Sequence, residues 1–477
     1  MCEAMSGASA GLEEMGVSRT FFLLKGLNTT LPHNAIVASL IELCFKGSVP
    51  FVVTDETFVD PYLSIVERLE RNLKCPVVRV DGSTVVPPRL FPDCGRMKAW
   101  QWENKTRAMR VERIEAAIRG EFDGVQVEAQ LEAKNEEFMP KLWKSPKADV
   151  LDGLAFRALG DVKEWVVTKM GGAGPMPCQQ TFGSTGAAMR RWERFVHGKG
   201  LENYAKKRND ARFPHNVSRM SCYLNVGVVP IFPLVSSVLS AKSSKMSDEI
   251  LKWREGSYLH CMYNREYRGS VNVPNWVKAS FVNKSSTSDN DECEGEGEGE
   301  GKGKGKGNLA ERLESCSSVC EVWNSMQSYL SNTGELHNNV RMTWGRQAVT
   351  WLRAGGYSVT DAMRILCRLN DRYALDGYAP QSYGGVLWCF GWGDKPGIDG
   401  GLKEKRSGGY KMGAFDFKAA EGRLVGGAGD SGGRLGGDAA GDGRSGRAHT
   451  MGNAVAAAGE RKSGSCSCRF EVAWRHR

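Results

Sequence analysis

The sequence has no long hydrophobic run and no regular cysteine pattern. No stretch of about 18 or more apolar residues occurs in its 477 residues, so we predict no membrane-spanning helix. The 14 cysteines form no repeated CxxC pairs at zinc-ligand spacing, so we predict no metal site. We expect them to be reduced thiols, in the core or on the surface of an intracellular protein.

The N-terminus also lacks the hydrophobic segment of a secretory signal. It carries Glu3, Glu13 and Glu14, whereas organellar transit peptides contain few acids. Among the nucleus, a plastid and a mitochondrion, this favours the nucleus. The net charge of +9 permits a polyanionic partner without requiring one. A monomer is the default expectation.

The first part of the chain has the pattern of an α/β domain. The stretches "PFVVTD" (50–55) and "CPVVRVDG" (75–82) are typical of buried strands, and "PYLSIVERLERNLK" (61–74) between them of an amphipathic helix. This βαβ pattern predicts a short, truncated parallel sheet. We assign residues 1–19 to a flexible start and 20–150 to this α/β domain with a helical linker.

Helical patterns dominate from Ser184, a predicted N-cap, to about residue 397. We therefore predict an all-α domain over 151–397. Glycine-rich acidic and basic blocks at 286–308 would interrupt it as a disordered insertion. The glycine-rich segment 398–477 is predicted to be a disordered tail.

Tryptophans recur at helical spacing in the second half of the chain. Trp344 and Trp351 are seven residues apart, so on one helix they would lie nearly in line, about 10.5 Å apart along the axis. Trp323 falls on the preceding predicted helix. Tryptophans at this spacing usually pack a hydrophobic core, although three large rings on adjacent helices are also what a chain for single-electron transfer needs.

Arg341 shares the predicted face of Trp344 and needs an anionic partner there. Candidate acids and amides follow in the sequence: Asn370, Asp371, Asp376 and Asp394. Such groups around an aromatic-lined helical pocket favour a bound polar heterocycle. A buried network of structural salt bridges is the alternative.

Two further segments carry candidate binding groups. Ser218 and Ser221 flank a predicted helix start in a basic segment, where backbone N–H groups would bind phosphate unless the loop is simply solvated. Glu249 and Trp253 are four residues apart, so both would lie on one helix face. They would hold an extruded base by hydrogen bonding and stacking, or form an exposed acid over a core ring.

Together, several stretches resemble the photolyase–cryptochrome superfamily. The resemblance is closest to class II cyclobutane pyrimidine dimer photolyases and the plant and algal photolyase-like branch. It keeps its order over roughly residues 184–397 and is carried by "SRMSCYLNVG" (218–227), "DEILKWRE" (248–255), "VWNSMQ" (322–327), "HNNVRMTW" (337–344), "LNDRYALDG" (369–377) and "SYGGVLWCFGWGDKPG" (382–397). The family implies an N-terminal antenna domain and a helical domain that holds FAD.

The resemblance also implies a role for each matching position around the cofactor. The FAD phosphates and ribityl chain would be met by Tyr204, Ser218, Arg219 and Ser221. The flavin pocket would be lined by Arg254, Asn338 and Asp376, with Arg341 and Asp394 as a charged pair near the ring and Asn370 facing flavin N5.

Matching positions further imply light chemistry on DNA. Trp344, then Trp323, then Trp351 would form the electron-transfer chain that photoreduces the flavin. Glu249, Trp253 and Trp388 would contact a flipped pyrimidine dimer. The implied function is light-driven repair of DNA containing cyclobutane pyrimidine dimers, as a carbon–carbon lyase. The alternative is a cryptochrome-like blue-light receptor without repair activity, which the long predicted tail favours.

The sequence departs from the family at several positions. The usual opening strand is missing, which makes the binding of an antenna pigment doubtful. Val217 stands where many relatives have Thr, and Pro380–Gln381 where a proline–asparagine step is expected.

Overall fold

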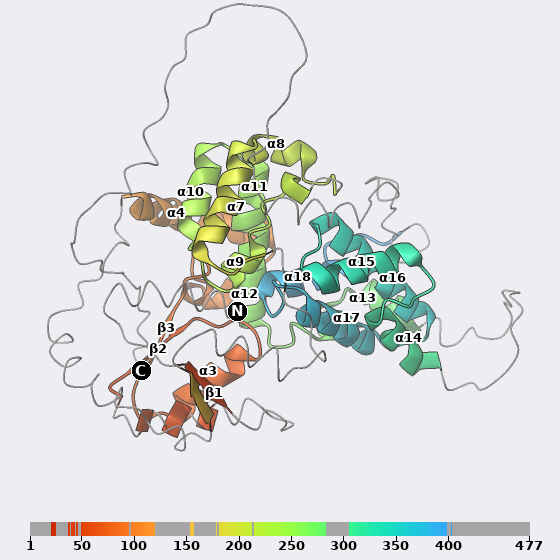
Figure 1. The fold of residues 1–477 in the computed structure, drawn as a ribbon, viewed down its shortest axis with the longest axis horizontal. Coiled ribbons are helices and arrows are strands. Elements are labelled where there is room, and N and C mark those ends of the chain that lie inside the picture. Colours follow the sequence, from red (N-terminus) through yellow and green to blue (C-terminus); the bar gives the residue numbers. More distant parts are fainter. Residues whose placement is uncertain are drawn as a thin grey trace, which may run out of the picture.

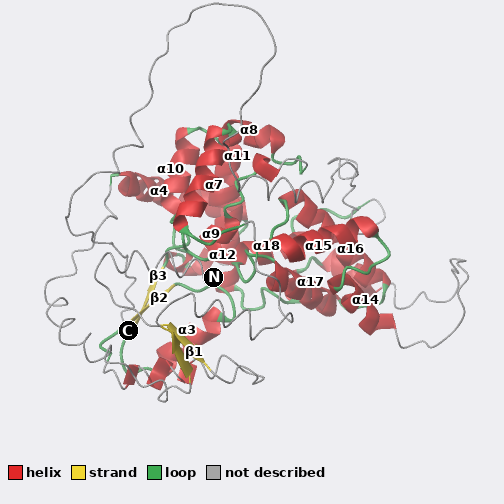
Figure 2. Cartoon of the chain, viewed as in Figure 1, coloured by secondary structure: helices red, strands yellow, loops and turns green. Residues whose placement is uncertain are grey.

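The structure is a computed structural model that describes residues 49–94, 97–119, 181–211, 214–282 and 305–397, with short pieces at 21–24, between 37 and 45, at 153–156, and at 178 and 402. Strands occur only in the N-terminal part of the described chain, and helices make up almost all of the rest (Figure 2).

The N-terminal part contains the predicted βαβ unit. Strands β2 (Val52–Asp55) and β3 (Val77–Val80) pair in parallel, and α3 (Tyr62–Asn72) connects them. The buried side chains of α3 recur at three-residue intervals, as its amphipathic pattern predicts: Leu63, Val66 and Leu69. The prediction of a short parallel sheet is confirmed.

A second pair of strands was not predicted. Strand β1 (Phe21–Leu24) pairs antiparallel with β4 (Gly153–Phe156). Strand β4 therefore lies inside the segment 151–397 that was assigned to the helical domain. Four-residue strands carry too little periodicity to be recognised, and only pairing with a distant partner identifies them.

The helical region begins with α4 (Ala99–Ile118) and resumes at α7 (Thr185–His197). Ser184 caps α7 as predicted, since its hydroxyl accepts a hydrogen bond from the Ala187 N–H. The helices that follow are α8 (Gly200–Lys207), α9 (Ser221–Asn225), α10 (Ile231–Ser240), α11 (Ser244–Asp248), α12 (Glu255–Tyr263), α13 (Asn275–Val282), α14 (Gly305–Glu314), α15 (Glu321–Thr333), α16 (Asn338–Ala354), α17 (Val359–Tyr373) and α18 (Pro380–Cys389). A π-helical segment, η5 (Glu249–Arg254), joins α11 to α12 without a break. Short 3₁₀ turns lie at η1 (Pro88–Leu90), η2 (Pro92–Cys94), η4 (Pro214–Asn216) and η6 (Ser270–Asn272).

Two hydrophobic cores hold these helices together. One lies among α4 and α7–α11, and the other among α13–α18. Helix α12 serves both, because Leu259 is buried in the first core and Tyr258 and Cys261 in the second. In Figure 1, α12 and α18 accordingly lie between the two groups of helices.

The glycine-rich segments fall largely outside the described residues. Within the predicted insertion 286–308, only Gly305–Asn308 are described, and they form the first turn of α14 rather than a loop. Packing further along this helix, where Leu313 is fully buried, outweighs the low helix propensity of glycine. The predicted tail 398–477 is described only at Leu402, and residues 1–19 not at all.

No described helix is both long and apolar enough to cross a bilayer. The same part of the chain contains no group of three or more histidine, cysteine, aspartate or glutamate residues arranged to hold a metal ion.

Candidate functional site

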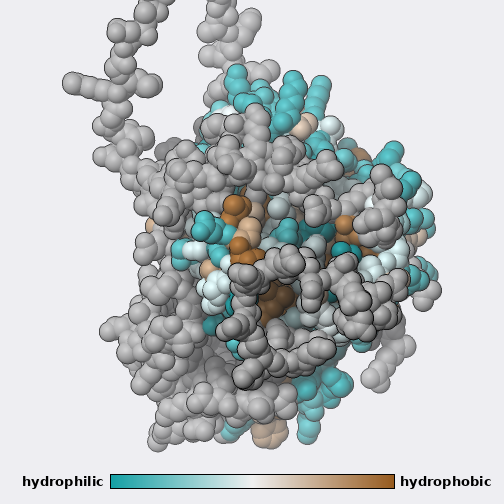
Figure 3. Space-filling view, turned by 90° about the vertical axis from the view of Figure 1, so that its right-hand side faces the viewer, coloured by the Kyte–Doolittle hydropathy of each residue, from teal (hydrophilic) through white to brown (hydrophobic). Residues whose placement is uncertain are grey.

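A cavity of about 560 Å³ lies between the two cores. This volume is in the usual range for sites that bind small molecules and cofactors. Helices α8, α9, α12, α16 and α18 and the π-helical segment η5 contribute its walls. Figure 3 shows, on one face of the molecule, several hydrophobic side chains with hydrophilic ones close to them.

Most of the predicted site residues line this one cavity. They are Tyr204, Ser218, Arg219, Ser221, Glu249, Trp253, Arg254, Asn338, Arg341, Asp376 and Trp388. The predicted residues outside the lining are Asn370, Asp394, Trp323, Trp344 and Trp351. Segments that are more than 180 residues apart in the chain thus meet at one place, as the family resemblance implies.

The turn before α9 places a cation at the cavity. Arg219 adopts a left-handed conformation with φ of 56°, which is uncommon for a residue with a side chain. Its Nε donates to Glu335 over 2.7 Å, while its buried Nη2 has no partner in the described chain. One face of the guanidinium is therefore available to an anionic ligand.

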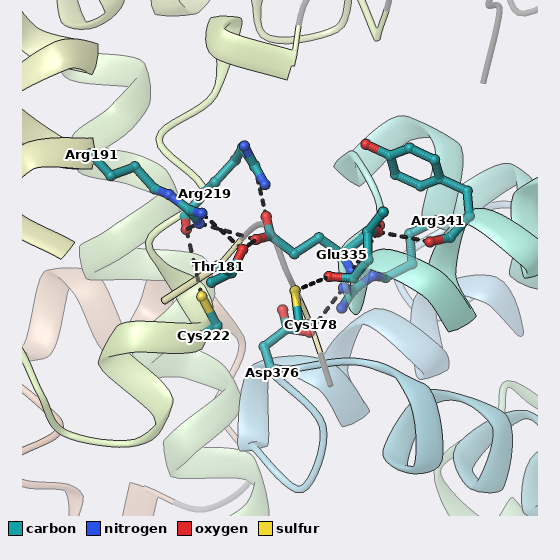
Figure 4. Close-up of polar contacts among 10 residues, drawn as sticks. Cys178, Thr181, Arg191, Arg219, Cys222, Glu335, Arg341 and Asp376 are labelled. Carbon is teal, nitrogen blue, oxygen red and sulfur yellow. Dashed lines mark hydrogen bonds and ion pairs between the residues drawn. The ribbon is translucent and has the colours of Figure 1, made fainter. Parts of the chain in front are cut away.

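Glu335 fixes this part of the wall. Its carboxylate accepts hydrogen bonds from Arg219, from Arg191 over 3.0 Å and from the Thr181 hydroxyl, as Figure 4 shows. Burial alone would raise the pKa of the Glu335 carboxyl, but Arg219 and Arg191 outweigh it and hold that pKa at about 2. The sequence analysis missed Glu335, because its partners lie 116 and 144 residues away.

The predicted ion pair between Arg341 and Asp394 is wrong. Arg341 pairs with Asp376 over 2.8 Å (Figure 4), and Asp394 pairs with Arg346 over 2.7 Å. Arg346 is five residues beyond Arg341 on α16, so it points to a different side of the helix. The sequence named the correct acid among its candidates for Arg341 but could not choose between them.

That Asn370 faces the bound ring stays a prediction. Asn370 is buried on α17, outside the cavity lining, and its Nδ2 has no hydrogen-bond partner among the described residues. Gln381 on α18 lies in the lining instead, and both polar atoms of its amide are buried without a partner in the described part of the structure. A buried amide is normally hydrogen-bonded, so Gln381 needs a polar ligand or water. The signal was in the sequence, where Pro380–Gln381 had been noted only as a departure from the family.

Helix α18 presents a stripe of Gln381, Gly385 and Trp388 to the cavity, at the spacing of one helix face. A Cβ at Gly385 would meet no atom within 4 Å, so the space above it is open. Gly384 differs, because a Cβ there would lie 2.5 Å from Ser257 Oγ on α12. Gly384 therefore lets α18 and α12 approach each other, and Gly385 leaves room for a ligand.

Aromatic rings form a second wall. Trp253 meets Trp388 edge to face, with ring centroids 5.8 Å apart, and Trp388 meets Trp392 at 6.2 Å. Trp253 lies on η5, and such π-helical turns occur most often at functional sites. Trp253 is 36% exposed and lines the cavity. It is therefore not a core residue covered by an exposed Glu249, which was the alternative interpretation.

Glu249 lies beside this wall and is held by two cations. Its carboxylate is 3.0 Å from Arg208 and 3.0 Å from Lys245. Tyr204 lies close by, where burial raises the pKa of its phenol to about 12 and the Glu249 charge adds to the rise. Glu249 therefore presents carboxyl oxygens as acceptors beside this wall, and Tyr204 is a neutral hydroxyl.

Arg254 and Asn338 line the cavity in different ways. The Arg254 guanidinium is buried and donates to the Ser83 carbonyl over 2.6 Å and to Tyr258 Oη over 2.9 Å, which ties the helical region to the N-terminal part. Asn338 is exposed and begins α16.

The three remaining tryptophans form a continuous chain of ring contacts. Trp323 stacks on Trp344, with ring centroids 6.1 Å apart and an angle of 11°, and meets Trp351 edge to face at 5.8 Å. Trp323 Nε1 donates to the Trp344 carbonyl and Trp344 Nε1 to Gln327, each over 2.9 Å. Trp344 comes one turn after Val340 and Arg341, which line the cavity. The rings therefore lead from the cavity wall outward in the order 344, 323, 351.

Comparison with known proteins gives one consistent result. The chain is 25% identical over 361 residues to a deoxyribodipyrimidine photo-lyase of Methanothermobacter thermautotrophicus, covering 74% of this chain and 69% of the relative. It is 24% identical over 210 residues to a protein of that name from Arabidopsis thaliana (42% of this chain, 38% of the relative). It is 32% identical over 191 residues to one from Potorous tridactylus (38% and 32%). No protein-family model matches the chain.

Proposed function

Since the chain belongs to the photolyase/cryptochrome superfamily, as a distant homologue of deoxyribodipyrimidine photo-lyases, we propose that it is a light-driven DNA repair flavoprotein. It would bind FAD and split cyclobutane pyrimidine dimers. The observation that carries the proposal is the continuous chain of tryptophan ring contacts that begins one helical turn from the cavity.

The lining of the cavity fits FAD. Arg219 offers a free N–H group to a phosphate, and Ser218 and Ser221 add hydroxyls beside it. The unpartnered amide of Gln381 offers a donor and an acceptor at once, which suits the edge of a flavin ring. Arg341 is kept in place by Asp376, so a positive charge is fixed at the wall. When bound, FAD would supply light absorption and the electron that splits the dimer.

The chain's own groups would do the positioning. Photolyases extrude their target bases from the duplex, and Trp253 and Trp388 provide aromatic faces for bases in that state. Glu249 would accept hydrogen bonds from the polar edge of the dimer, with Arg208 and Lys245 holding its carboxylate in place. The basic character of the chain, with a net charge of +9, supports binding to DNA phosphates.

An absorbance spectrum of the purified protein tests the proposal first. We expect flavin bands that bleach under blue light in the presence of a thiol reductant, followed by restoration of thymines in DNA that contains dimers. Protein with bound, photoreducible flavin but no repair would reject the repair proposal.

Glu249→Gln sharpens this test. It keeps the shape of the side chain but removes the charge, so we expect repair to fall about 10-fold or more, as when a charged hydrogen-bond partner is lost, while flavin content stays the same. Unchanged repair would remove the substrate role from Glu249.

A cryptochrome-like photoreceptor without repair activity is the second candidate. The composition of residues 398–477 favours it, since glycine-rich tails of this kind bind partners on ordering. Photoreduction without repair, together with light-dependent proteolysis of the tail, would support this candidate. Binding of a partner that is unchanged by deleting the tail would count against it.

A further inference from the structure

The aromatic wall extends beyond the two rings assigned to the dimer. Trp392 and His260 both line the cavity. Their ring centroids are 5.4 Å apart, and Trp392 continues from Trp388 at 6.2 Å. The wall is thus an unbroken row of rings, in the order 253, 388, 392, 260.

The turn that carries Trp392 is built for one conformation. Gly391 and Gly393 on either side have φ of 80° and 81°, a region that residues with side chains rarely adopt. A Cβ at Gly393 would lie 2.8 Å from the Trp388 ring, so only glycine lets this backbone close over that ring.

Arg346 stabilises the same turn by two hydrogen bonds. It donates to the Trp388 carbonyl over 2.8 Å and to the Asp394 carboxylate over 2.7 Å. The Asp394 N–H in turn donates to the Gly391 carbonyl over 2.9 Å. Trp392 is therefore presented by a braced loop and would lose little conformational entropy on binding a ligand.

His260 completes the wall as a neutral ring. It lies on α12, which continues directly from the segment η5 that carries Trp253, and both side chains line the cavity. Burial lowers the pKa of its imidazole, so the ring is uncharged at neutral pH. Asn264 Nδ2 lies 3.5 Å from its Nε2, so one ring nitrogen already has a polar neighbour within the protein.

We propose that Trp392 and His260 form a second stacking subsite, which holds the nucleobase that adjoins the dimer in the same strand. This inference rests on the proposed function. Trp253 and Trp388 provide faces for the two joined pyrimidines, and the row then continues over two more rings. Every nucleobase has a flat face, so stacking there would be tolerant of sequence.

Binding in the dark, measured by fluorescence anisotropy on the flavin-loaded protein, tests the subsite. One oligonucleotide carries a thymine dimer between normal nucleotides, and a second carries the dimer with abasic analogues on both sides. In the wild type, the abasic analogues should weaken binding about 5- to 100-fold, the range for one stacked base. In Trp392→Leu and His260→Ala, the normal oligonucleotide should bind more weakly, and the abasic analogues should cause little further loss.

Control variants separate this effect from damage to the fold. Trp392→Phe keeps an aromatic face and should recover most of the affinity that Trp392→Leu loses. Trp100→Ala removes a 52% exposed tryptophan that is not in the cavity lining and should change nothing. Flavin content and thermal unfolding report whether each variant is folded.

Other outcomes overturn the inference in different ways. If Trp392→Leu weakens both oligonucleotides equally, the ring contacts the dimer itself and not its neighbour. If Trp392→Leu changes neither, there is no subsite. If the wild type does not prefer DNA with a dimer to undamaged DNA, the proposed function fails, and this inference fails with it.

Discussion

Two groups of tryptophans in this protein differ in burial and in surroundings. Trp323, Trp344 and Trp351 form a chain of ring contacts in the α15–α16 region, and the first two are 1% exposed with their indole N–H groups bonded. Trp253, Trp388 and Trp392 meet edge to face and line the cavity. The buried group suits transfer of electrons through closely spaced rings, and the open group suits contact with a ligand.

The difference arises from what surrounds each ring. Helices α15 and α16 press flat faces together and leave no room for a ligand. Trp253 on η5 and Trp388 on α18 border the cavity, which stays open at this point because Gly385 has no side chain to fill it. The same residue type is thus placed in two environments, and packing decides which of the two proposed roles each environment suits.

Among the predicted variants, a substitution in the buried group of tryptophans should have the largest effect on photochemistry. In Trp323→Phe, the ring that contacts both other members of the group becomes much harder to oxidise, so we expect nearly complete loss of flavin photoreduction. Phenylalanine keeps most of the apolar volume, so flavin binding in the dark should persist. Blue-light bleaching with a thiol measures this, and repair by chemically reduced protein serves as the control. Normal bleaching would show that electrons take another route.

Glu335 combines features of the buried and the open group, because its side chain is nearly buried and also lines the cavity. Glu335→Gln leaves Arg191 and Arg219 without their counter-charge, so we expect the free energy of unfolding to fall by roughly 3 kcal/mol at pH 7. Flavin content should also fall, because Arg219 loses the group that orients it. Urea unfolding and the flavin-to-protein absorbance ratio measure the two effects.

The same variant has a defined pH dependence. The pKa of Glu335 in the folded protein, about 2, lies below its ordinary value of 4.5. Its contribution to stability is therefore complete above about pH 4.5 and is lost as the pH falls toward 2. The stability difference between wild type and Glu335→Gln should shrink over that window. A difference that stays constant down to pH 3 would contradict the ion-pair explanation.

The smallest effect tests the open space in the aromatic wall. Gly385→Ala adds a methyl group that meets no protein atom, and alanine raises helix propensity, so the apoprotein should become more stable by up to about 1 kcal/mol. Ligand binding should weaken, since the methyl group points into the cavity. Gly384→Ala is the matched control and should lose stability instead, because its Cβ would approach Ser257. Stronger or unchanged ligand binding in Gly385→Ala would mean that the space is not used.

The sequence predicted the parts of the site that depend on local pattern. Ser184 as an N-cap, the helix start at Ser221 and the placement of Trp323 and Trp344 on neighbouring helices all follow from spacing within one or two turns. It failed where the answer depends on segments far apart in the chain. Asp376 rather than Asp394 pairs with Arg341, and Gln381, noted only as a departure from the family, lines the cavity.

By itself, then, the sequence determined which residues are available and on which helix face each one lies, because helical periodicity is a local property of the backbone. The tertiary structure alone decided which acid meets which arginine and which tryptophans are buried. It also left the Gln381 amide without a partner at the cavity. These outcomes depend on how the two cores close around α12, and that arrangement is set by packing between residues more than a hundred positions apart.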